Sequence, residues 1–281
     1  MTYRIMQLSD LALQLLKNKQ NGAIHSVYRK TINMNIDGSL LALQSSHSPL
    51  SPISLLSNLD EKAMEELDID TNTPVEITDT SVIIGSSVFY YDSAEVFPCE
   101  LNKILSPLGI KTLKKNVETV LSSSRTGGFD VIYRNYRDRS IELPSLFLEG
   151  ARNYLSQAYH CIQNGNDASS SVFLARLIGL GTGLTPSGDD FLCGMLAGLI
   201  LTGKSDSHFA EILKETIQDS LTNTNDISRA FLHCALEGKF STAVNSLTEV
   251  PDPDYISSAF HEIGHSSGMD TLCGFLFSLS L

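Results

Sequence analysis

The most constraining feature of this sequence is a ten-residue segment that occurs twice. Ser187 to Leu196 (SGDDFLCGML) aligns without gaps with Ser267 to Leu276 (SGMDTLCGFL), 80 residues later, and seven of the ten positions are identical. Two copies at this spacing are not typical of a solenoid, in which many short units stack on one another. We therefore expect two helical hairpins related by a pseudo-twofold axis.

In each copy a polar turn precedes an apolar helix. Thr185 and Pro186 supply an N-cap and a first helical residue for the first helix, and Ser266 or Ser267 can cap the second. Both helices are apolar nearly all round, which is typical of buried helices. Gly194 and Gly198 lie four residues apart, as do Gly274 and Ser278. Small residues at this spacing allow close approach, so we expect the two helices to cross at the centre of their domain.

Crossing would bring the two helix N-termini to one region. Helix N-termini carry partial positive charge and free amide groups, which favour anions. Each aspartate there has two interpretations: it offsets its own helix dipole, or it belongs to a substrate or metal site. The substrate-binding residues predicted from the two copies are Thr182, Gly183, Thr185, Ser187, Gly188, Asp189, Ser266, Ser267 and Gly268.

Two further features are candidates for the same site. His265 directly precedes the serines of the second copy, which makes it the best acid or base candidate. The polar turn from Thr222 to Arg229 precedes another apolar helix. It is either a capping segment or a third contributor, in which Arg229 binds a carboxylate or phosphate.

The sequence contains no strong cofactor motif. The glycines at 179–183 are not followed by Gly-Lys-Ser/Thr and follow a helical pattern, so neither a P-loop nor a Rossmann fingerprint is present. We expect no cofactor and no resident metal. Asp189, Asp190 and Asp270 could supply oxygen ligands to Mg²⁺, but spacing alone does not place them together. Five scattered cysteines without a CxxC pair indicate free thiols in a reducing cytoplasm.

Chain length and net charge limit the number of domains and the classes of partner that the chain can have. A chain of 281 residues predicts two domains. The 32 acidic against 20 basic residues, a net charge of −12, argue against nucleic-acid and anionic-membrane partners but not against small anions. The start lacks the pattern of a signal peptide, and the longest apolar run is too short to span a bilayer. The expected localisation is cytoplasmic.

Patterning predicts an α+β protein with a β-rich domain, barrel- or sandwich-like, over 1–143 and an all-helical domain over 144–281. An amphipathic helix is predicted at 1–21 and a loop at 48–57. Short helices are predicted at 61–67 and 111–122, and a linker at 137–144. Strands are predicted at 23–36, 40–44, 74–78, 81–84, 87–91 and 129–133. Helices of the second domain are predicted at 146–162, 170–177, 186–201, 207–221, 227–236, 242–247, 254–263 and 268–279.

The segments Gly181–Leu196 and Ile263–Phe275 together resemble the AllH-like family, and Tyr28–Leu41 is similar to it less specifically. The resemblance implies a subunit of oxamate carbamoyltransferase, acting in anaerobic allantoin and purine breakdown. In that reaction phosphate splits oxalurate into oxamate and carbamoyl phosphate. The family's activity is attributed to several subunits acting together, so this chain would hold only part of the active site.

The chemistry of such a reaction suits the predicted residues. Phosphorolysis needs an anion cradle, donors for the developing oxyanion and an acid for the leaving nitrogen. The helix amides with Thr185, Ser187 and Ser267 would form the cradle, and His265 would be the acid. Asp190 and Asp270 would orient it or bind the substrate amide. The alternatives are a non-catalytic scaffold subunit and a small-anion-binding module.

Overall fold

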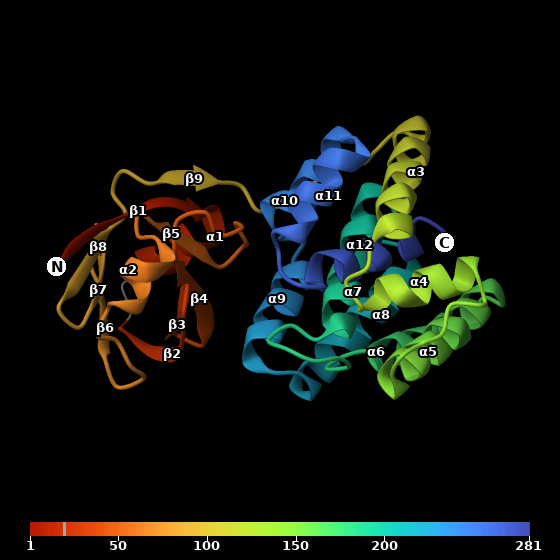
Figure 1. Ribbon diagram of the computed structural model, residues 1–281, viewed down its shortest axis with the longest axis horizontal. Coiled ribbons are helices and arrows are strands. Elements are labelled where there is room, and N and C mark those ends of the chain that lie inside the picture. The colour runs from red at the N-terminus through yellow and green to blue at the C-terminus, as the bar shows by residue number, and fades with distance from the viewer. Residues whose placement is uncertain (19–20) are drawn as a thin grey trace. The chain divides into compact units, whose positions relative to one another are not determined.

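The computed structural model describes residues 1–18 and 21–281, and the chain forms two compact units, Met1–Cys99 and Glu100–Leu281 (Figure 1). The first unit is built mainly of strands and the second of helices, as the α+β prediction requires.

Eight strands of the first unit close into a barrel. In order around the barrel they are β1 (Thr2–Ser9), β5 (Ser54–Ser57), β4 (Ser39–Gln44), β3 (Thr31–Ile36), β2 (Gly22–Tyr28), β6 (Pro74–Ile77), β7 (Ser81–Ile84) and β8 (Ser87–Tyr90), which pairs with β1 again. A short ninth strand, β9 (Glu95–Phe97), pairs in parallel with the end of β1. Ring closure pairs the edges that an open sheet would expose, and apolar side chains such as Ile32 and Phe89 fill the interior. Of the two predicted alternatives, the barrel is confirmed.

Local turn chemistry explains the best-predicted part of the barrel. Asp37 and Gly38 join β3 to β4, and both have positive φ, 50° and 81°. A two-residue turn of this kind matches the twist of the strands it connects. The side-chain oxygen of Asn35 accepts a hydrogen bond from the Gly38 N–H at 2.8 Å, which stabilises the turn.

The start of the chain differs from the prediction. A helix is predicted over 1–21, but residues 2–9 form β1, and only α1 (Asp10–Lys17) is helical. Ile5 and Leu8 are buried among the barrel's side chains, and β1 pairs with both β5 and β8, so sheet pairing overrides the apparent helical period. Lys19 and Gln20, also within the predicted helix, lie outside the described residues. The predicted loop at 48–57 is likewise partly wrong, because it contains β5.

The second unit is helical throughout its regular elements. Its α-helices are α3 (Pro107–Ser123), α4 (Phe129–Arg137), α5 (Leu146–Gln163), α6 (Asp167–Ala175), α7 (Ser187–Leu201), α8 (His208–Ser220), α9 (Asp226–Leu236), α10 (Thr242–Ser246), α11 (Pro253–His261) and α12 (Ser267–Ser278). One-turn 3₁₀ helices follow α8 and α10. In the barrel unit the only α-helix besides α1 among the described residues is α2 (Glu61–Glu65).

The boundary between the units falls earlier than predicted. The sequence predicts domains 1–143 and 144–281, whereas the compact units divide between Cys99 and Glu100. The reason is that α3 and α4 share the apolar core of the helical unit, with Leu113, Val117 and Phe129 among its buried residues. The strand predicted at 129–133 is α4 instead, so its β-branched and aromatic residues pack as a helix.

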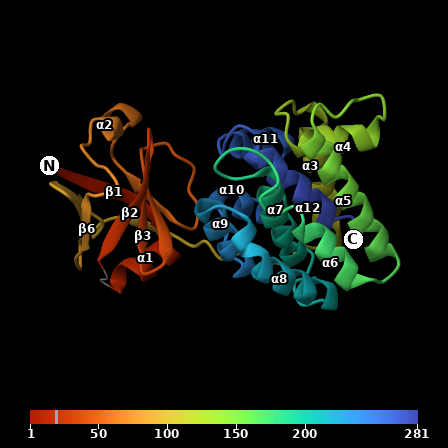
Figure 2. The same ribbon diagram turned by 90° about the horizontal axis from the view of Figure 1, so that it is seen from below.

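Helices α7 and α12 form the centre of the helical unit and lie side by side in both views (Figures 1 and 2). Glycine makes this contact possible. A Cβ on Gly194 would lie 1.8 Å from the carbonyl oxygen of Thr271, and one on Gly274 would lie 1.8 Å from that of Phe191. The backbones therefore touch at a separation that no other residue permits. The predicted close crossing of the two helices is confirmed.

Candidate functional site

The crossing brings the two helix N-termini together. The Thr185 and Ser267 hydroxyls, which precede and open the two helices, lie 2.9 Å apart. The side-chain contacts are reciprocal: Ser267 hydrogen-bonds Asp190, and Ser187 hydrogen-bonds Asp270. Each helix therefore supplies a carboxylate that meets a hydroxyl from the start of the other. We call Asp190 and Asp270 the aspartate pair.

Asp190 is held in an environment that disfavours its charge. Burial of the carboxylate raises its pKa well above the usual range, and the negative charge of Asp270 raises it further. Hydrogen bonds from Ser267 and Thr185 act in the opposite direction and are outweighed. Its Oδ2 atom is shielded from solvent and has no hydrogen-bond partner among the described residues.

Asp270 is fully buried. Burial raises the pKa of its carboxyl to about 7, and the charge of Asp130 adds to the increase. The opposing contacts are the Phe129 N–H, which donates to Oδ1 at 2.6 Å, and the hydroxyls of Ser187 and Ser266. Its Oδ2 also lacks a hydrogen-bond partner within the described chain. Two adjacent carboxyl groups with raised pKa values favour retention of a proton at neutral pH.

A third helix N-terminus, which the sequence analysis missed, completes this arrangement. Helix α4 begins directly at Asp270, and a Cβ on Gly128 would lie 2.3 Å from Oδ1 of that aspartate. Buried Asp130 fixes the turn before α4, because its Oδ2 accepts the Ser124 hydroxyl and the Thr126 N–H, both at 3.1 Å. The only sequence hint is Gly127-Gly128 followed by an aspartate. Because the sequence pattern predicts a strand at 129–133, it does not indicate that a helix starts at Phe129.

Asp189, adjacent to the pair, has a different environment. Its Oδ1 accepts the Gly179 N–H at 2.8 Å, and its Oδ2 accepts the hydroxyls of Thr224 at 2.5 Å and Ser228 at 2.6 Å. Burial raises its pKa, and these three hydrogen bonds oppose that effect. Both oxygens are used within the protein, so Asp189 ties α7 to the 179 turn and to α9.

Two of the predicted substrate-binding glycines are packing positions. A Cβ on Gly188 would lie 1.9 Å from the carbonyl oxygen of Leu177, and one on Gly268 would lie 1.8 Å from that of Phe260. Because these glycines have no side chain, the preceding segment passes directly over the start of α7 at Gly188 and over the start of α12 at Gly268. Gly183, by contrast, has open space around it and a φ of 95°.

The remaining predicted residues lie at the edge of the site. Thr182, Gly183 and His265 are exposed in the loops before α7 and α12. Arg229 is occupied locally, because it donates to the carbonyl oxygens of Leu221 and Thr224 and pairs with Asp226 at 2.9 Å. Among the described residues, neither Arg229 nor His265 forms a hydrogen bond or an ion pair with the aspartate pair. The capping interpretation of the 222–229 turn therefore accounts for the contacts of Arg229.

Metal-binding clusters and membrane-spanning helices are both absent from the described part of the chain. Over residues 1–18 and 21–281, no three His, Cys, Asp or Glu side chains are arranged to hold a metal ion. The same residues include no helix with the length and apolar character needed to cross a membrane.

The fold and site define an α+β protein with a β-barrel and a helical unit whose repeated helices enclose an acidic pair. Comparison with family models identifies both parts. Residues 4–96 match the AllH family N-terminal domain, and residues 177–279 match the model described as oxamate carbamoyltransferase subunit AllH. These matches cover most of the chain, and the protein belongs to the AllH family. A comparison with solved structures found no match.

Proposed function

We propose that this chain is the subunit of an oxamate carbamoyltransferase in which the aspartate pair handles the proton of the transfer reaction. The observation that carries the proposal is the meeting of three helix N-termini, those of α4, α7 and α12, on two carboxyl groups, buried Asp270 and half-buried Asp190, each with a shielded and unpartnered oxygen. The name of the family supports the reaction, and it also implies other subunits with which this chain assembles.

The proton chemistry follows from the raised pKa values. In phosphorolysis of oxalurate, a phosphate oxygen forms a bond to the carbamoyl carbon, and the bond from that carbon to the oxamate nitrogen breaks. The departing nitrogen needs a proton. The pair, holding one proton at neutral pH, would donate it to the nitrogen and recover one from the attacking phosphate. Carbamoyl phosphate and oxamate are then the products.

The helix N-termini would bind the anionic parts of the substrates. The hydroxyls of Thr185, Ser187 and Ser267, at the positive ends of α7 and α12, form the proposed cradle for phosphate or for the oxamate carboxylate. Partial positive charge at these ends would also stabilise the developing oxyanion. The reciprocal contacts between the helices support the predicted pseudo-twofold relation of the two copies.

The contacts seen in the structure lead us to assign different roles to several of the predicted site residues. We assign the acid role to the aspartate pair and place His265 in the exposed loop before α12, at the edge of the site. Asp189 becomes a positioning residue, since its carboxylate binds three groups of the protein. Thr182 and Gly183 would contact substrate from the loop before α7, and Arg229 would position the 222–229 turn.

Substrate needs a route to the shielded Oδ2 atoms. The loops before α7 and α12 contain Gly181, Gly183 and Gly264, with φ of 138°, 95° and 157°. Glycine adopts such backbone conformations at little cost, so these loops can change shape more readily than the helices they precede. We propose that they open to admit substrate.

The test is a substitution in the assembled enzyme. Asp270→Asn and Asp190→Asn keep the size of each side chain but remove the exchangeable proton. Each is expected to lower kcat by about 10²- to 10⁴-fold, the usual contribution of general acid catalysis. Phosphorolysis of oxalurate is measured as release of carbamoyl phosphate, across a range of pH.

A matched control is Asp254→Asn, an exposed aspartate in the first turn of α11. It should leave both rate and pH profile unchanged. If the two pair variants assemble, fold and turn over at the rate of the unmodified enzyme, the pair has no catalytic role. If their rates are unchanged yet oxamate or phosphate stabilises the chain, the anion-binding module is the better description. If neither oxamate nor phosphate stabilises the chain, the non-catalytic scaffold is the better description.

A further inference from the structure

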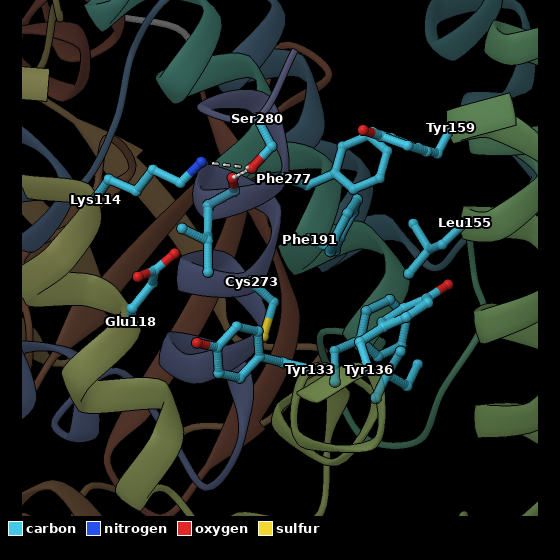
Figure 3. Close-up of a pocket in the computed structure, with 13 residues that line it drawn as sticks. Lys114, Glu118, Tyr133, Tyr136, Leu155, Tyr159, Phe191, Cys273, Phe277 and Ser280 are labelled. Atoms are coloured by element: carbon cyan, nitrogen blue, oxygen red, sulfur yellow. Dashed lines mark hydrogen bonds between the residues drawn. The ribbon is translucent and has the colours of Figure 1, made fainter. Parts of the chain in front are cut away.

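The helical unit contains a cavity whose lining includes no residue of the two loops that precede α7 and α12. It has a volume of about 210 Å³ and is lined by residues of α3, α4, α5, α7 and α12, with Ser280 just beyond α12 (Figure 3). We call it the aromatic pocket. Its volume is below that of a typical drug-sized site, but it exceeds the roughly 150 Å³ of a cavity that holds benzene. A ligand of this pocket is therefore small.

The two sides of the aromatic pocket differ in chemistry. The rings of Phe191 and Phe277 lie on one side, with their centroids 5.6 Å apart, whereas Lys114, Glu118 and the hydroxyl of Tyr133 lie on the other (Figure 3). A ligand that fits both sides has an apolar body and a polar head. Apolar pockets with a few placed polar groups are the usual form of small-molecule sites.

The polar side offers one positive and one negative group that are not paired with each other. Lys114 and Glu118 lie four residues apart on α3, a spacing that commonly gives an ion pair. Instead, Lys114 Nζ donates to Ser280 Oγ at 3.1 Å, and within the described chain neither residue forms a salt bridge. Both side chains are half-buried. The sequence pattern of 111, 114 and 115 suggests only a solvated lysine face, so the position of Lys114 is a finding of the structure.

The hydroxyl of Tyr133 is a second independent observation. It is buried and has no hydrogen-bond partner among the described residues. A buried hydroxyl without a partner destabilises the protein, and a ligand that hydrogen-bonds it at the polar end would remove that cost. We propose that the aromatic pocket binds a zwitterionic α-amino acid with an apolar side chain. Lys114 receives its carboxylate, Glu118 its ammonium group, and the phenylalanine rings its side chain.

The proposal is independent of carbamoyl transfer and is tested by binding alone. Isothermal titration of the full chain with L-leucine and L-phenylalanine is expected to show saturable binding at one site. Two fragments separate the contributions: 4-methylpentanoate lacks the ammonium group of leucine, and 3-methylbutylamine lacks its carboxylate. Each should bind at least about tenfold more weakly than L-leucine, because it leaves one charged group unpaired.

Substitutions locate the site. Lys114→Met and Glu118→Gln should each weaken L-leucine binding by about tenfold or more, whereas Lys115→Met, at the next, exposed position of the same helix, should bind as the unmodified chain does. Circular dichroism checks that the variants fold. The proposal is overturned if neither amino acid binds at millimolar concentration, if either fragment binds as tightly as L-leucine, or if folded Lys114→Met binds normally.

Discussion

The glycine contacts between α7 and α12 make a strong prediction about Gly194→Ala. The new Cβ would lie 1.8 Å from the Thr271 carbonyl oxygen, whereas ordinary contacts begin at 3.4 Å. The helices would have to separate by more than about 1 Å, which costs about 3 kcal/mol or more by overpacking. Alanine recovers about 1 kcal/mol as the better helix former. We expect a net loss of about 2 kcal/mol.

Gly150→Ala is the matched control. Gly150 lies inside α5, and a Cβ there meets nothing within 4 Å. The same substitution should therefore stabilise the helical unit, by about 0.5–1 kcal/mol. The two variants are expected to shift stability in opposite directions although they make the same chemical change.

The assay is urea unfolding followed by far-ultraviolet circular dichroism, which reports mainly on the helical unit. The loss at Gly194 corresponds to a Tm decrease of about 4–8 °C for a unit of this size. Gly274→Ala, whose Cβ would lie 1.8 Å from the Phe191 carbonyl oxygen, should lose a similar amount. A Gly194→Ala protein as stable as Gly150→Ala would refute the close crossing.

Three further predictions concern the carboxyl groups. First, the native state holds a proton on Asp270 up to pH of about 7, whereas the unfolded chain releases it near 3.8. Stability of the helical unit should therefore fall as pH rises through this window, by up to about 1.4 kcal/mol per pH unit for each such proton. Asp270→Asn should flatten that slope in urea midpoints measured across pH, and an unchanged slope would contradict the assignment. Second, Asp189→Ala leaves Gly179 N–H, Thr224 and Ser228 without their acceptor and should lower the free energy of unfolding by about 3 kcal/mol, against less than about 1 for Asp254→Ala. Third, Gly128→Ala would place a Cβ 2.3 Å from Asp270 Oδ1 and should reduce kcat of the assembled enzyme by about tenfold to hundredfold. A normal rate and pH profile in that variant would show that Asp270 need not sit where α4 holds it.

The internal repeat explains why the centre of the site was predictable. Its identical positions include the glycines that allow the crossing and the aspartates that the crossing brings together. Periodicity likewise located the helices from α5 to α12, since each is long or strongly capped. The hairpin turn at Asp37-Gly38 was also readable, because its backbone conformation restricts residue choice.

The parts that local patterns misassigned depend on distant partners. Strand β1 carries apolar residues at spacings that suit a helix as well, and only its pairing with β5 and β8 selects the strand. The run from Phe129 to Tyr133 is rich in strand formers, yet it forms a helix whose apolar residues share the core of the helical unit and whose first amide donates to Asp270, 141 residues away. Short segments do not contain that information.

Phe129 connects two regions of the helical unit. Its amide holds the Asp270 carboxylate, while its ring lines the aromatic pocket and packs against Phe191, with centroids 5.5 Å apart. A ligand in the pocket would contact this ring, and any shift of the ring would change the hydrogen bond from the Phe129 amide to Asp270. Proton affinity at the carboxyl and ligand affinity in the pocket would then be thermodynamically linked, each altering the other by the same factor.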